Sequence, residues 1–262
     1  MLKKRCKTGL AAVTIAALIL PGCVTTQADR IGPNDGSDAC YQYRVALDST
    51  GDFYASDMVK GVVIGAAAGA VAGGILGGDL RSAAIGAVAG GALGALGGYW
   101  NAKVQQGRDQ AILGVLSDLD TENQTLSKTQ VALDQLVNCR RGEIARVKAD
   151  YKAKRIDKAT ADQRLATIRA QLEKDYQIAS TINQNVVKRR DEYLFAADQI
   201  QPGSSDKVRA AAKAKKKPAG GKDQASQVVA RTTTAVETSE RINASTTQIQ
   251  QMAQREATLE AV

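Results

Sequence analysis

The sequence contains no histidine, so the commonest general base and the commonest metal ligand are both missing. Aromatic residues make up only 4% of the chain, which argues against a large globular core. There is also no phosphate loop, no metal-ligand spacing and no nucleophile motif such as G-x-S-x-G. We therefore expect a protein that is not an enzyme, with no cofactor, no metal and no nucleic-acid partner.

The first 23 residues have the pattern of a secretory signal. The basic stretch M-L-K-K-R-C-K precedes an apolar region at residues 8–20, which is too short for an ordinary membrane span. The sequence L-P-G-C follows and ends at Cys23. We expect residues 1–22 to be a lipoprotein signal peptide and residues 23–57 to be a linker. An ordinary cleaved signal followed by a chance cysteine is the alternative.

Glycine recurs every fourth residue in two runs, although it is a poor helix former. Four residues advance a helix by slightly more than one turn, so each run lies along one helix face. Without side chains, such a face lets another helix approach closely, which is a main source of helix association in a bilayer. The predicted helix-packing residues are Gly61, Gly65, Gly69, Gly73, Gly77, Gly86, Gly90, Gly94 and Gly98.

The two glycine runs are apolar and about 20 residues long, which is roughly the length that crosses a hydrocarbon core. The polar turn D-L-R-S separates them. We predict a glycine-zipper membrane hairpin over residues 58–100, with a soluble zipper or a linker as alternatives. Phe53 and Tyr54 precede the first run, and Tyr99 and Trp100 end the second. In a hairpin both aromatic pairs would lie at one membrane surface, as an aromatic belt.

Residues 101–200 carry apolar residues at alternating spacings of four and three, which predicts an antiparallel coiled-coil hairpin. Leucine dominates one heptad column of the first arm, and the polar residues Asn123 and Gln130 fall in the other. Arg140 interrupts the apolar seam. Asp157 is the predicted N-cap of a second arm that runs from about Lys158 to Ile200. The apolar positions of that arm are Leu165, Ile168, Leu172, Ala179, Ile182, Val186 and Tyr193.

The last part of the chain begins with a basic stretch and ends as a polar helix. Residues 201–225 read as a flexible linker, and seven of its residues between Lys207 and Lys222 are basic. This linker is either a solvated spacer or a contact with an anionic surface, such as lipid headgroups, an envelope protein or a cell-wall polymer. Residues 226–262 carry a thin apolar stripe at Ile242, Ile249, Met252 and Leu259, so this helix needs a partner.

Two of the four cysteines are free to form a disulfide. Cys6 is removed with the signal and Cys23 becomes lipidated, which leaves Cys40 and Cys139 in an oxidising compartment. They form a disulfide either within one chain or between two chains.

The L-P-G-C sequence followed by the two glycine runs resembles the glycine-zipper outer-membrane lipoproteins, such as those of the rickettsial surface antigen and SlyB type. The resemblance implies that Cys23 becomes the N-terminus and carries the lipid. Because residue 24 is Val and not Asp, it also implies an outer-membrane address.

The predicted fold is therefore all-α. It combines a two-helix glycine-zipper membrane hairpin, a long antiparallel coiled-coil hairpin and a C-terminal helix. We expect a non-enzymatic, periplasm-facing lipoprotein that inserts in membrane lipid, self-associates as a homo-oligomer and projects a helical scaffold. The alternative is an oligomeric pore or a component of a secretion or efflux assembly.

Overall fold

The computed structural model describes residues 27–54, 97–105, 107–216 and 221–259. Residues 41–54 and 97–104 are helical. The other helices are α1 (Gln27–Ile31), α4 (Arg108–Lys152), α5 (Lys158–Ile200), α6 (Ser204–Ala214), α7 (Gln224–Gln251) and a short π-helix, η1 (Met252–Glu256). These described residues contain no strand, so the prediction of an all-α fold is confirmed for them.

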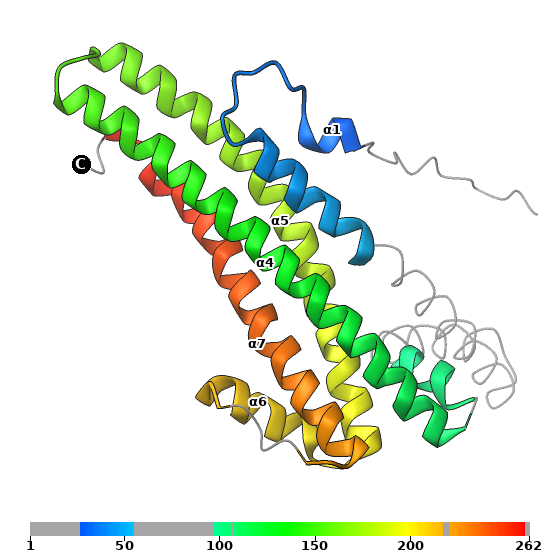
Figure 1. Cartoon of the computed structure of the whole chain (residues 1–262). Helices are drawn as coiled ribbons and strands as arrows, with labels where there is room; N and C mark the ends of the chain where they lie inside the picture. Colours follow the sequence, from blue (N-terminus) through cyan, green and yellow to red (C-terminus); the bar gives the residue numbers. More distant parts are fainter. Residues whose placement is uncertain (1–26, 55–96, 106, 217–220, 260–262) are drawn as a thin grey trace, which may run out of the picture.

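Helices α4 and α5 are the two long arms that the heptad spacing predicts, and they lie side by side (Figure 1). Every apolar position predicted for the second arm is buried. On the first arm, Leu119, Leu126 and Leu133 of the leucine column are at most 2% exposed. The heptad pattern therefore identified the inner faces of both helices.

A tight turn at residues 153–157 reverses the chain between the two arms. Lys154 adopts a left-handed backbone conformation with φ of 56°. Asp157 then caps α5, because its side chain accepts a hydrogen bond of 2.7 Å from the backbone N–H of Thr160. The helix ends before Gln201, whose backbone is extended. The predicted bounds of the second arm are thus confirmed.

Helix α7 packs against both α4 and α5, so the core is a bundle of three long helices and not a two-armed hairpin (Figure 1). Its predicted apolar positions Ile242 and Ile249 are fully buried, as is Met252 at the start of η1. Small hydroxyl residues fill most of the remaining buried face: Thr232, Thr233, Thr238, Ser239, Ser245 and Thr246. Their small size gives α7 a buried face that is much wider than its apolar stripe.

Residues 41–54 form a helix that packs against the long arms, whereas the sequence predicts a linker over residues 23–57. Leu47 and Tyr54 in this helix are fully buried. Gly51 lies so close to α5 that an added Cβ would be 3.3 Å from Cγ1 of Ile182. The difference arises because the helix depends on contacts with residues 75 or more positions away in sequence.

Two further predictions are corrected by the structure. Tyr54 and Trp100 belong to the bundle core, with exposed fractions of 0% and 5%, so these rings do not form a membrane aromatic belt. The predicted flexible linker over residues 201–225 includes the regular helix α6, which packs on α7 and α5. Alanine-rich sequence favours helix, and Val208 and Ala212 give α6 an apolar side to bury.

None of the helices among the described residues is both long enough and apolar enough to cross a membrane. Most of the predicted membrane hairpin, residues 58–96, lies outside the described residues. Only its last part, from Gly97 onward, is described, and there the chain packs on the bundle as helix 97–104.

Candidate functional site

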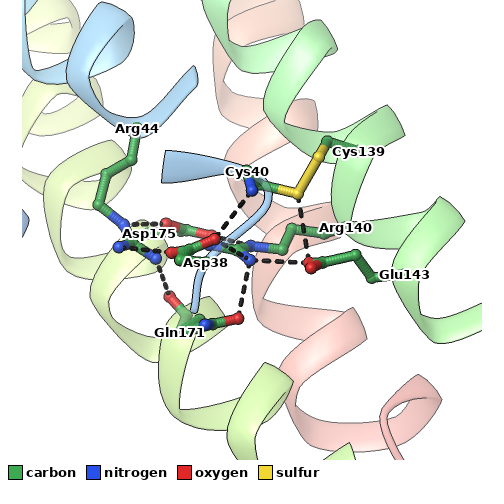
Figure 2. The surroundings of a disulfide bond; sticks show 8 residues. All are labelled: Asp38, Cys40, Arg44, Cys139, Arg140, Glu143, Gln171 and Asp175. Atoms are coloured by element: carbon green, nitrogen blue, oxygen red, sulfur yellow. Dashed lines mark hydrogen bonds and ion pairs between the residues drawn. A yellow bond between two sulfur atoms is a disulfide. The ribbon is translucent and has the colours of Figure 1, made fainter. Parts of the chain in front are cut away.

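A disulfide joins Cys40, at the start of helix 41–54, to Cys139 in the middle of α4 (Figure 2). The two Cα atoms are 5.9 Å apart, and the cysteines are 99 positions apart in sequence. Of the two pairings that the sequence left open, the structure therefore holds the one within a single chain. Cys40 is fully buried and Cys139 is half-buried.

A buried ionic cluster surrounds this disulfide, with Arg140 at its centre (Figure 2). The Nε atom of Arg140 donates to Asp175 at 2.7 Å, and its two Nη atoms donate to the Asp38 carboxylate at 2.8 and 2.9 Å. Arg44 binds the same two carboxylates, at 2.5 Å to Asp175 and 2.8 Å to Asp38. Gln171 accepts a further hydrogen bond from Arg140 at 2.9 Å.

The ionic cluster pairs opposite charges that come from three separate parts of the chain. Arg140 lies on α4, Asp175 on α5, and Asp38 and Arg44 on the N-terminal segment. Arg140 and Asp175 are both 0% exposed, so neither charge would be tolerated there without the other. The cluster and the disulfide therefore fix one register of helix 41–54 against both long arms.

The pKa of Asp38 reports the balance of forces in this cluster. Burial alone would raise it, but the hydrogen bonds from Arg140 and the charges of Arg140 and Arg44 outweigh burial, so the pKa of the carboxyl lies below its ordinary value. Burial likewise opposes the charge of Arg140, yet the hydrogen bonds and charges of Asp38 and Asp175 raise the pKa of its guanidinium. Both groups are therefore charged at neutral pH.

The arrangement does not support metal binding. Asp38, Cys40 and Glu143 bring possible ligand atoms within 4.8 Å of one another. However, the Cys40 sulfur is committed to the disulfide, and both carboxylates bind the guanidinium of Arg140. That guanidinium would repel a cation at this place. We conclude that the cluster is a structural clasp for the N-terminal segment.

A second ionic contact lies near the ends of the segment that the structure leaves undescribed, residues 55–96. The Nε of Arg189 donates to the buried Glu122 at 2.8 Å. Its guanidinium carbon lies 4.9 Å from the ring centre of Phe53 and 5.9 Å from that of Tyr193. The ring centres of Tyr193 and Tyr99 are in turn 5.4 Å apart. Phe53 and Tyr99 are thus bridged by two residues one turn apart on α5.

Most residues predicted as functional lie outside the described residues. These are the lipidation site Cys23 and the glycines from Gly61 to Gly94; Gly98 is buried in helix 97–104. Sequence reasoning noted Arg140 only as an interruption of the heptad pattern and did not find the ionic cluster. A charged residue at a core position was the available signal, but its partners Asp38 and Asp175 are distant in sequence.

Comparison with protein families, with curated proteins and with solved structures finds no match for this chain.

Proposed function

We propose that this chain is a lipid-anchored protein of the bacterial envelope, which inserts a glycine-zipper hairpin in the outer membrane and projects its helical bundle into the periplasm as a scaffold. The N-terminal signal pattern, Cys23 and the glycine runs motivate the proposal. The bundle has no catalytic arrangement among the described residues, so a binding or structural role suits it best.

The disulfide between Cys40 and Cys139 is the observation that carries the proposal. Disulfides persist in oxidising compartments such as the bacterial periplasm and are rare in the cytosol. The signal pattern alone predicts export, and a disulfide whose two cysteines lie before and after the glycine runs supports the same compartment independently. It also supports placing both flanks of the hairpin on one side of the membrane.

The positions of Phe53 and Tyr99 support the hairpin in a second way. A segment that crosses a bilayer twice returns to the surface from which it left. Phe53 and Tyr99 flank residues 55–96, and both pack around Arg189 and Tyr193. A single span would instead require its two flanks to lie on opposite sides of the membrane, about 30 Å or more apart.

Replacing Cys23 by serine tests the lipid anchor. We expect the Cys23→Ser protein to remain an unprocessed precursor and to take up no labelled fatty acid, because serine cannot form the thioether to the lipid. Metabolic labelling followed by membrane fractionation measures this, with Cys6→Ser as the matched control. Undiminished label on the Cys23→Ser protein would show that the lipoprotein proposal is wrong.

Crosslinking in isolated membranes tests the scaffold against the alternative of a pore. A scaffold predicts monomers or small assemblies crosslinked to another envelope component. A discrete large homo-oligomer would favour the pore or secretion component, since several hairpins are needed to line a channel.

A further inference from the structure

Helix α6 carries an exposed basic face that the bundle itself does not use. The basic residues of this helix and the two residues after it are all exposed: Lys207, Arg209, Lys213, Lys215 and Lys216. Asp206 is the only acidic residue in the same stretch. Among the described residues, no ion pair or side-chain hydrogen bond is formed by any of the five.

The basic face is held in a fixed direction by the opposite side of α6. Val208 and Ala212 are buried against Leu194 of α5 and Val236 of α7. Because these positions are spaced four residues apart, the helix cannot rotate without exposing them. Lys207 and Arg209 consequently lie on the two flanks of the exposed side of α6, and Lys213 lies on the outer side between them.

Helix α6 lies at the same end of the bundle as the end of the predicted membrane hairpin (Figure 1). Leu194 packs on α6, and the next residue, Phe195, packs on Gly97, where an added Cβ would be 3.3 Å from the Phe195 ring. One turn of α5 thus contacts both α6 and Gly97, the first described residue after residues 55–96. A membrane at this end would lie close to the basic face.

We propose that the basic face of α6 docks on anionic lipid headgroups of the membrane that holds the hairpin. This proposal depends on the proposed membrane hairpin. Basic residues are attracted to an anionic lipid surface only within about 10 Å, so their place at this end of the bundle matters. The lipid contact would fix the tilt of the bundle, because α6 provides a second attachment beside the hairpin.

A spin label at Ala210 measures this docking directly. Ala210 is exposed and lies opposite the buried side of α6. The full chain with Ala210→Cys would be labelled and reconstituted in vesicles of phosphatidylcholine, with or without phosphatidylglycerol. We expect the label to be protected from a water-soluble relaxing agent in the vesicles with phosphatidylglycerol and accessible in those without it.

Charge removal on α6 should abolish this protection. Replacing Lys207, Arg209 and Lys213 by glutamine should weaken docking on the order of 100-fold, at about fivefold for each basic residue near the surface. The matched control makes the same change in net charge near the C-terminal end of α4, away from α6, where three basic residues are exposed. These residues are Arg141, Arg146 and Lys152.

The outcomes separate this proposal from the proposed function. Equal accessibility of the label in both kinds of vesicle overturns the proposal, as does an equal loss of protection in the control. Protection by cell-wall fragments in place of anionic vesicles also overturns it. A protein that fails to float with either kind of vesicle contradicts the membrane hairpin itself, and the docking proposal with it.

Discussion

Replacing Arg140 by methionine removes the cation at the centre of the ionic cluster and should destabilise the bundle by about 3–5 kcal/mol, the usual result of breaking a buried ion pair. Arg140 is 0% exposed, and its guanidinium binds both Asp38 and Asp175. Methionine fills a similar volume, so the loss comes mainly from the two carboxylates. Arg44 alone would have to neutralise both of them.

The effect is large enough to measure by thermal unfolding. At about 2–4 °C per kcal/mol for a chain of this size, the melting temperature should fall by about 6–20 °C. Far-UV circular dichroism of the full chain in detergent follows the loss of helix. Arg141→Met is the matched control, because Arg141 is the neighbouring residue on α4 and is exposed.

A double-mutant cycle distinguishes the ionic cluster from simple packing. Removing Asp175 together with Arg140, as Asp175→Asn, leaves Arg44 paired with Asp38. The double variant should therefore be less destabilised than the sum of the two single variants, by about 0.5–3 kcal/mol. If the losses simply add, or if Arg140→Met melts together with Arg141→Met, the cluster does not hold the N-terminal segment as we describe.

Three further perturbations test other parts of the molecule. Replacing Cys40 and Cys139 by serine should lower the free energy of unfolding by about 4.7 kcal/mol, because the disulfide closes a loop of about 100 residues in the unfolded chain. An unchanged midpoint of urea unfolding would contradict a stabilising role for the disulfide. Gly69→Leu should weaken hairpin association in bilayer crosslinking, because bulk separates the helices, whereas Val71→Leu should not; identical behaviour of the two contradicts the zipper. The pKa of Asp38 is lowered in the folded state, so its contribution to stability is complete above about pH 4 and is lost as the pH falls further. The free energy of unfolding in urea should therefore fall less over that acidic range for Asp38→Asn than for the unchanged protein, and equal falls contradict this account.

The parts of the fold that depend on local signals could be predicted from the sequence. The heptad spacing identified the inner faces of α4 and α5, and Asp157 marked the start of α5 because an N-cap acts within three residues. Helix α7 was predicted as a helix that needs a partner, but the sequence did not show that α4 and α5 are its partners. Its buried threonines and serines resemble a polar surface in sequence, although they suit close packing.

The ionic cluster could not be predicted because its members meet only in the folded chain. Asp38, Arg140 and Asp175 are each ordinary charged residues when read locally, and only their common burial gives them a role. The same holds for helix 41–54, whose few apolar residues are buried only by packing against α4 and α5. Long-range pairing of this kind leaves no periodic pattern in a single sequence.

The disulfide also determines how mechanical force would pass through the molecule. Cys40 and Cys139 lie on opposite sides of residues 55–96 along the chain. Tension applied from the N-terminal side is therefore carried across the sulfur–sulfur bond directly into the middle of α4. Residues 41–138, which include both glycine runs, belong to a covalently closed ring beside this path and bear none of the load. A pull on the N-terminus would thus reach the bundle without passing through the residues of the proposed hairpin.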